Sequence, residues 1–240
     1  MNRTTHYFYS NLLDKTIEYQ YVLPDSVIDE AYLLYVQDGN DYLELGGVED
    51  TYKLLKKHFP ELMNKLLLVL IHPGTSEERW HSYHRKGKYF QQYMDFMYQE
   101  FIPEVESDLK QRFKNLTIVK RGLIGDSLAG NISLNIAALN PELWTHLLLQ
   151  SAAITEGDID AVVKREKLDL KVYQTVGVYE DEFISTITDE RLYIYSRNKV
   201  LYERLKNKVP IILFKEKEES HLWEFWKRNL PEALEFFLRN

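Results

Sequence analysis

Short apolar runs alternate with segments of helical apolar spacing along this chain, and that alternation restricts the possible folds more than any other feature. Residues 66–71 (LLLVLI) are apolar throughout, as are residues 31–36 (AYLLYV). Such runs are typical of strands buried on both faces, as in a parallel sheet covered by helices. Strands that alternate with helices indicate βαβ units. We therefore expect one α/β domain over residues 1–240, with a mostly parallel sheet, helices on both faces and no large lid.

The same patterns predict the individual elements. Strands are expected over residues 16–23, 31–36, 66–71, 117–124, 145–150, 170–176 and 209–214. Helices are expected over residues 48–58, 89–113, 128–139, 190–208 and 230–238, the second of them interrupted or kinked near Pro103. Proline has this effect because it lacks the N–H that a helix interior needs. Residues 75–88, which follow Pro73 and Gly74, are expected to form a loop rich in charged and aromatic side chains.

Composition excludes several classes of function. The chain has no cysteine, which excludes disulfides, a thiolate nucleophile and a cysteine zinc site. The net charge of -7 comes from interspersed acids and bases, so no basic face for nucleic acid is expected. The longest apolar run, residues 66–71, is too short to span a bilayer, and the first residues lack the apolar stretch of a secretory signal. We expect a cytoplasmic protein with no membrane partner.

Ser127 follows the predicted strand 117–124 and precedes the predicted helix 128–139. A nucleophilic serine on such a strand-to-helix turn needs small residues two positions away on either side, because the strained turn brings backbone segments close together. Gly125 and Ala129 occupy those positions, and Gly130 follows. The motif reads G-x-S-x-A, one methyl away from G-x-S-x-G. The alternative is an ordinary turn serine.

An acid and a histidine follow two later predicted strands. Residues 180–182 (EDE) come after strand 170–176, and His221 comes after strand 209–214. Functional groups gather at the carboxyl ends of strands in open α/β sheets. The chain order serine, acid, histidine is the one that an α/β-hydrolase fold requires. His221 would take the proton of Ser127, and a carboxylate would orient the imidazole. Glu180 and Asp181 are both candidates for that acid.

Two backbone N–H groups are needed to stabilise the oxyanion of the reaction. Leu128, directly after the serine and at the start of a helix, is expected to supply one of them. The turn formed by residues 38–40 (DGN) is the best candidate for the other, because Gly39 permits a backbone conformation that points an amide inward.

Four segments together resemble the putative esterase family of α/β hydrolases, which includes esterase D and enterochelin-esterase-like proteins. The resemblance extends from about Tyr19 to the C-terminus and rests on residues 35–42 (YVQDGNDY), 100–106 (EFIPEVE), 125–130 (GDSLAG) and 220–226 (SHLWEFW). In that family the acid commonly stands three residues after a glycine at a strand end, which favours Glu180 over Asp181. The residue after the D-G pair commonly supplies the second oxyanion amide, which implies Asn40. The family needs no metal or cofactor.

The chain departs from the family pattern at two places. Ala129 replaces the glycine of the turn. The family's R-x-x-E-Y-like sequence reads R-W-H-S-Y over residues 79–83, with serine in place of glutamate. We expect Trp80, Tyr83 and Asp126 to contact the substrate, although an aromatic loop packed on the domain is an equal alternative for the first two.

Histidines in the same region leave a metal site as an alternative. His72, His81 and His84 lie near Glu77 and Glu78, and the H-x-x-H spacing suits one face of a helix. Pro73 and Gly74 favour a loop instead, so no metal is expected.

These features predict a serine esterase that hydrolyses a small-molecule carboxylic ester through an acyl-enzyme. The 17 tyrosines and the family resemblance favour a siderophore-type or aromatic acyl ester. Two alternatives remain: a non-catalytic binding or scaffold protein of the same fold, and an acyltransferase that uses the same triad.

Overall fold

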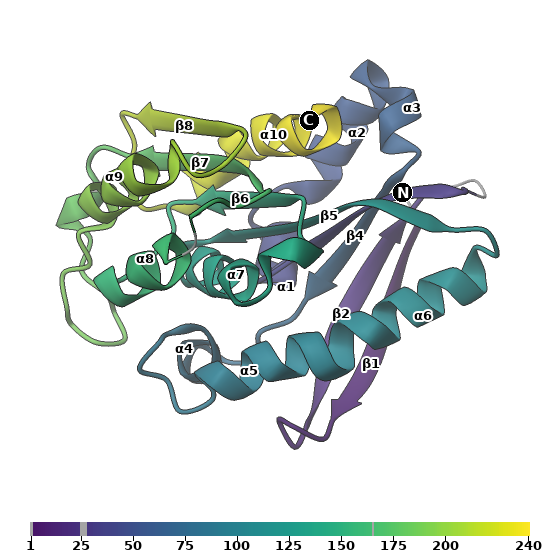
Figure 1. The fold of residues 1–240 in the computed structure, drawn as a ribbon, viewed down its shortest axis with the longest axis horizontal. Helices are drawn as coiled ribbons and strands as arrows, with labels where there is room; N and C mark the ends of the chain where they lie inside the picture. Colours follow the sequence, from purple (N-terminus) through teal and green to yellow (C-terminus); the bar gives the residue numbers. More distant parts are fainter. Residues whose placement is uncertain (1, 25–27, 165) are drawn as a thin grey trace.

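One eight-stranded sheet forms the centre of the protein, which a computed structural model describes for residues 2–24, 28–164 and 166–240 (Figure 1). Its strands are β1 (Asn2–Ser10), β2 (Lys15–Leu23), β3 (Glu30–Val36), β4 (Leu66–Ile71), β5 (Thr117–Asp126), β6 (His146–Gln150), β7 (Lys171–Gly177) and β8 (Ile212–Lys217). They lie in the order β1-β2-β4-β3-β5-β6-β7-β8. β1 pairs with β2, and β2 with β4, in antiparallel orientation. Every further pair in this order, from β4-β3 to β7-β8, is parallel. The predicted mostly parallel sheet is confirmed.

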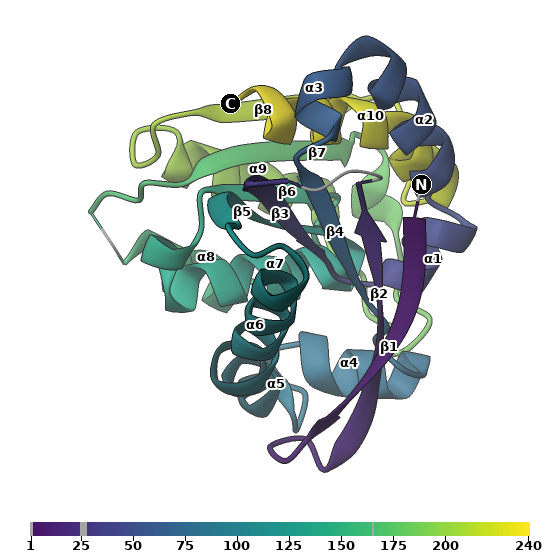
Figure 2. The same cartoon turned by 90° about the vertical axis from the view of Figure 1, so that its right-hand side faces the viewer.

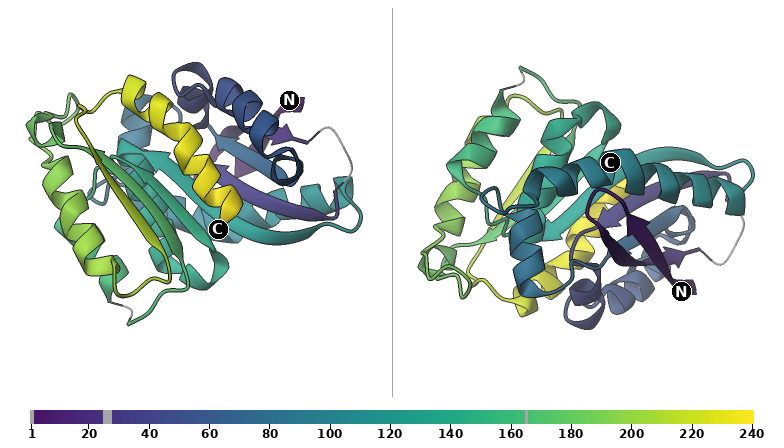
Figure 3. Two further views of the ribbon diagram at one scale, coloured as in Figure 1. Left: turned by 90° about the horizontal axis from the view of Figure 1, so that it is seen from above. Right: turned by 90° about the horizontal axis from the view of Figure 1, so that it is seen from below.

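Helices cover both faces of the sheet. They are α1 (Gly39–Glu44), α2 (Val48–His58), α3 (Pro60–Met63), α4 (Ser76–Tyr83), α5 (Phe90–Phe96), α6 (Ile102–Arg112), α7 (Ser127–Leu139), α8 (Glu156–Val163), α9 (Ile194–Leu205) and α10 (Trp223–Arg239). A π-helical turn spans Met97–Phe101, and short 3-10 turns span Pro141–Leu143 and Glu180–Glu182. Figure 3 shows α10, α2 and α3 over one face and the long α5–α6 segment over the other.

Each face of the sheet packs its own apolar core. Leu34, Leu68 and Leu70 point to the side of α1, α2 and α10, where they meet Tyr52 and Phe237. The alternate strand residues point to the side of α5 to α9 and form the larger cluster. β4 is buried along its whole length, as its continuous apolar run predicts. β1 has one buried residue, and Figure 2 shows it at the edge of the sheet, where it pairs with β2 alone.

Several element bounds differ from the prediction. α10 begins at Trp223 rather than at residue 230 and contains Pro231. α9 begins at Ile194, and β8 is displaced toward the C-terminus by three residues at each end relative to the predicted 209–214. β1 was not predicted, because its polar sequence carries no buried strand pattern. The irregularity expected near Pro103 is the π-helical turn directly before it, where the hydrogen-bond ladder is displaced by one residue.

The predicted loop over residues 75–88 is wrong in its first part, which forms α4. Thr75 caps this helix: its side chain accepts from the N–H of Glu78, whose carboxylate accepts from the N–H of Thr75. This T-x-x-E capping box is readable in the sequence and outweighs Pro73 and Gly74, which lie before the helix begins.

Candidate active site

Ser127 lies at the turn between β5 and α7 with φ of 43°. This left-handed conformation is strained for a residue with a side chain, and such strain is found where function requires it. A Cβ on Gly125 would lie 2.3 Å from the carbonyl carbon of Ala129, so only glycine fits there without displacing α7. The turn is therefore built as the sequence predicts.

Ala129 fits this turn because the close contact is made by the next residue. Ala129 is fully buried, whereas a Cβ on Gly130 would lie 2.8 Å from Cβ of Ala152 in the loop after β6. There is thus no room for a side chain at residue 130, beside Ala152. The methyl group of Ala129, in contrast, packs in the apolar core.

His221 reaches Ser127 from the loop between β8 and α10. Its Nε2 lies 2.9 Å from Oγ of Ser127. The imidazole is 8% exposed and packs between Phe183, at a ring-centroid distance of 4.3 Å, and Trp226, at 4.8 Å. These two aromatic rings restrict the rotation of the imidazole, so that one nitrogen faces the serine.

Glu180 lies on the other side of the imidazole. It is fully buried, and its Oε2 is 3.5 Å from Nδ1 of His221. Its other oxygen, Oε1, accepts a hydrogen bond from Oγ of Ser151 at 2.7 Å, and that hydroxyl accepts one from Nε1 of Trp226 at 2.9 Å. The carboxylate is therefore held by a chain of side chains that sequence reasoning did not identify.

The neighbouring Asp181 has a different role. Its carboxylate accepts hydrogen bonds from the N–H of Ser196, at 2.9 Å, and from the hydroxyl of the same residue. Ser196 lies in the first turn of α9, where N–H groups have no partner inside the helix. Asp181 thus caps α9, whereas the carboxylate near His221 is that of Glu180.

The loop of residues 38–40 is packed tightly against β4. Asp38 has φ of 56°, and a Cβ on Gly39 would lie 2.4 Å from the carbonyl carbon of Leu70. Asn40 follows in the first turn of α1, and Leu128 occupies the same position in α7. The first N–H groups of a helix have no acceptor inside it, so both amides are available to a ligand.

A buried ion cluster joins this loop to the serine turn. Nε of Arg79 on α4 donates to Oδ2 of Asp38 at 2.6 Å, and its Nη2 lies 3.9 Å from Oδ2 of Asp126. Asp38 is fully buried and Asp126 is 1% exposed. Burial raises the pKa of Asp126 well above its usual value, and the charge of Asp38 adds to this effect.

Of the three predicted substrate contacts, two lie below the surface. Tyr83 is fully buried, and its hydroxyl donates to Oε1 of Gln37 at 3.0 Å. Asp126 is enclosed beside Arg79, as described above. We therefore assign Tyr83 and Asp126 to the support of the site. Trp80, in contrast, lines a cavity of about 390 Å³ next to the serine turn.

This cavity is walled on one side by the segment that follows α4. The rings of Trp80 and His84 are stacked with centroids 5.1 Å apart and planes 11° apart. Burial lowers the pKa of His84, which favours the neutral ring. Leu128 and Ala153 line the end nearest to Ser127.

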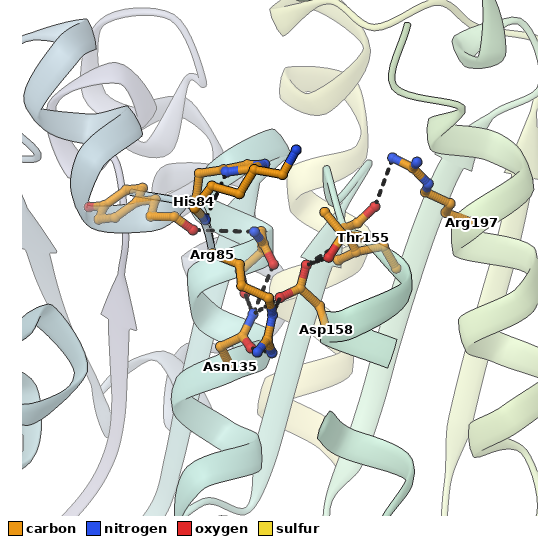
Figure 4. Close-up of polar contacts among 10 residues, drawn as sticks. His84, Arg85, Asn135, Thr155, Asp158 and Arg197 are labelled. Carbon is orange, nitrogen blue, oxygen red and sulfur yellow. Dashed lines mark hydrogen bonds and ion pairs between the residues drawn. The ribbon is translucent and has the colours of Figure 1, made fainter. Parts of the chain in front are cut away.

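Arg85 anchors the same segment to the body of the protein (Figure 4). Its Nε donates to Oδ1 of Asp158 at 2.8 Å, and its Nη2 donates to Oδ1 of Asn135 at 2.9 Å. Asp158 also accepts from the N–H and the hydroxyl of Thr155 at the start of α8. The segment after α4 is thus tied to α7 and α8, as expected of a fixed wall rather than a mobile lid.

Two further findings concern metals and membranes. In the part of the chain that the structure describes, no three His, Asp or Glu side chains are grouped so as to hold a metal ion. Over the same residues, every helix is too short or too polar to cross a bilayer.

The sheet order, the strained serine turn after β5 and the histidine after β8 define an α/β-hydrolase fold. Residues 10–237 match the family described as putative esterase, so the chain belongs to that family and is a carboxylic ester hydrolase.

Individual relatives are distant. The chain is 25% identical over 236 residues to the uncharacterized protein YjcH of Bacillus subtilis (strain 168), covering 96% of this chain and 95% of that one. A ferulic acid esterase of known structure aligns with a TM-score of 0.73 at 18% identity, over 99% of this chain and 97% of its own. The enterochelin esterase of Shigella flexneri aligns with a TM-score of 0.78 at 16% identity, over 100% of this chain and 59% of its own. At these identities, the similarity to the two solved structures shows that the chain shares their fold.

Proposed function

We propose that this protein is a serine esterase that hydrolyses its substrate through an acyl-enzyme formed on Ser127. The observation that carries the proposal is the 2.9 Å contact between Oγ of Ser127 and Nε2 of His221, with the buried carboxylate of Glu180 on the far side of the imidazole. A serine hydroxyl is a weak nucleophile at its own pKa and needs an adjacent base.

Acylation then proceeds in two steps. Nε2 of His221 takes the proton as Oγ of Ser127 attacks the ester carbonyl, and the imidazolium then gives that proton to the leaving alcohol. Glu180 keeps Nδ1 protonated and stabilises the positive charge that forms on the ring. Water, activated by the same histidine, hydrolyses the acyl-enzyme.

The backbone N–H groups of Leu128 and Asn40 are proposed to stabilise the oxyanion. Both lie in the first turn of a helix that begins at the carboxyl edge of the sheet, α7 after β5 and α1 after β3. Preorganised donors of this kind each contribute about 10²–10³-fold to kcat.

The substrate that the site fits best is an ester with an aromatic acyl group, of the ferulate or siderophore type. The stacked rings of Trp80 and His84 offer a flat face in the cavity beside Ser127. The names of the ferulic acid esterase and the enterochelin esterase that share the fold support the same class.

The test combines covalent labelling with turnover. Intact-mass spectrometry after a fluorophosphonate probe, with hydrolysis of short p-nitrophenyl esters measured in parallel, is run on the wild type and on Ser127→Ala. The control is Ser133→Ala, which removes another buried serine of α7. We expect one adduct on the wild type and on the control, and neither adduct nor turnover for Ser127→Ala. A folded wild type without adduct or turnover would refute the proposal.

A further inference from the structure

The cavity beside Ser127 has an uneven set of charges. Lys86, Arg191 and Arg197 line it, and among the residues that the structure describes no carboxylate lies within ion-pair distance of any of the three. Arg85, directly before Lys86 in the chain, shows the contrast, because its guanidinium is neutralised by Asp158. Whereas Arg85 serves the structure, the charges of the other three remain open to the cavity.

Arg197 is the best positioned of these cations. It is half-buried on α9, and its Nη1 donates to the carbonyl oxygen of Leu192 at 2.7 Å and to that of Ile154 at 3.4 Å. Carbonyl groups orient a guanidinium without cancelling its charge, and two of its five N–H donors are used in this way. Figure 4 shows Arg197 on the opposite side of Thr155 from His84. The remaining donors are available to a ligand.

Arg191 lies on the same wall. Its Nε donates to the carbonyl oxygen of Asp181, and its guanidinium carbon lies 5.2 Å from the ring centroid of Tyr193. The guanidinium carbon of Arg197 lies 6.0 Å from the same ring centroid. Both guanidinium groups therefore lie near the ring of Tyr193, and because like charges repel, an anion bound close to both would relieve that repulsion.

Acidic side chains offset part of the charge of this wall. Glu156 and Glu190 also line the cavity, and they are exposed, as are Lys86 and Arg191, so that water screens all four of these charges, whereas Arg197 is half-buried. The lining therefore has three cations and two carboxylates, in a protein whose net charge is -7. The half-buried guanidinium of Arg197 is the least screened of these charges, and it favours an anionic ligand.

We propose that the cavity is a subsite for an anionic group, such as a carboxylate, carried by the ester substrate at a distance from the scissile bond, with Arg197 as the residue that determines this specificity. This inference rests on the proposed function and adds charge selectivity to it. A guanidinium with free parallel donors suits a carboxylate, which it can bind in a bidentate manner.

Two pairs of substrates test the proposal. The first pair is 4-methylumbelliferyl 4-carboxybenzoate and its neutral 4-carbamoyl analogue, which place the charge on the acyl side. The second is 4-carboxyphenyl acetate and 4-carbamoylphenyl acetate, which place it on the alcohol side. We expect kcat/KM to favour the anionic member of at least one pair by about tenfold or more, with the preference decreasing as ionic strength rises.

The variants then identify the residue. Arg197→Gln should reduce the preference to about twofold or less while kcat/KM for the neutral member stays unchanged, and Lys86→Gln, at an exposed position, should reduce it in part. Arg204→Gln, an exposed arginine on the same helix, is the matched control and should retain the full preference. Absence of a preference in the wild type, or an equal effect of Arg204→Gln, overturns the subsite. Loss of turnover with every ester, together with no labelling of Ser127, overturns the proposed function itself, so that the two failures are distinguishable.

Discussion

Arg79 donates from Nε to Oδ2 of Asp38 at 2.6 Å, and this bond ties α4 to the loop that leads into Asn40. Asp38 is fully buried, and the side chain of Arg79 is 19% exposed, so the bond lies largely away from water. Asp38 also has φ of 56°, a conformation that its surroundings must enforce. The ion pair therefore fixes the backbone from which one oxyanion amide is proposed to come.

Replacing Arg79 by Met should lower both stability and kcat. Removing one partner leaves buried carboxylates unpaired, which costs about 3–5 kcal/mol of unfolding free energy. Relaxation of the loop should lower kcat by about 10–100-fold with a smaller change in KM, because the amide of Asn40 is proposed to act in the transition state. Urea unfolding and steady-state kinetics measure the two effects. The double variant Arg79→Met/Asp38→Asn should recover part of the lost stability; strictly additive losses would contradict the pairing.

Glu180 and Asp181 are adjacent acids with separable effects. Glu180→Gln should reduce kcat by about 10²–10⁴-fold with little change in fold, since it removes the charge that is proposed to stabilise the imidazolium. Asp181→Asn should leave kcat within about threefold of the wild type and cost about 0.5–2 kcal/mol of stability, as expected for a helix cap. Kinetics and thermal unfolding of both variants check this assignment. The reverse pattern would make Asp181 the triad acid.

Ala129 and Gly130 test how the serine turn tolerates small side chains. Ala129→Gly should retain activity within a few-fold and lose about 0.5–1 kcal/mol through lower helix propensity. Gly130→Ala should cost more, about 1–3 kcal/mol, because its new methyl would lie 2.8 Å from Cβ of Ala152. The comparison requires unfolding curves for both variants. Equal stability would show that the loop after β6 moves aside freely.

Local patterns made much of the site predictable. The serine turn, the strands before it and the position of His221 follow from apolar runs and small residues that are close in sequence. The supporting contacts could not be predicted in this way: Arg79 meets Asp38 across 41 residues, Arg85 meets Asp158 across 73, and Ser151 meets Glu180 across 29. Such pairs depend on how helices pack on the sheet, which no spacing in the sequence encodes.

Tyr83 and Asp126 are two residues whose side-chain direction could not be predicted from the sequence. Aromatic and acidic residues near a predicted nucleophile are reasonable substrate contacts, yet both point inward here. Tyr83 lies on α4, and the register of that helix decides that Trp80 faces the cavity while Tyr83 faces Gln37. The expectation of a loop at this segment left the register undefined.

The buried His146 should make the stability of the fold depend on pH. This residue of β6 is fully buried against Phe237, at a ring-centroid distance of 5.0 Å, and burial, with the nearby charges of Lys120 and Lys171, lowers its pKa to about 3. The unfolded chain binds a proton at this histidine below a pH of about 6.5, whereas the folded protein does not until the pH reaches about 3. Stability contributed by the neutral ring is therefore present above pH 6.5 and is lost as the pH falls through this window.

His146→Leu removes the proton-binding group and should lessen the decrease in melting temperature between pH 7 and pH 4, whatever its effect on stability at pH 7. The effect on the unfolding free energy is at most about 1.4 kcal/mol for each pH unit. Thermal unfolding across this range, with His58→Gln on the exposed side of α2 as control, measures the difference. Parallel pH profiles for the wild type and His146→Leu would show that the buried histidine does not contribute to acid sensitivity.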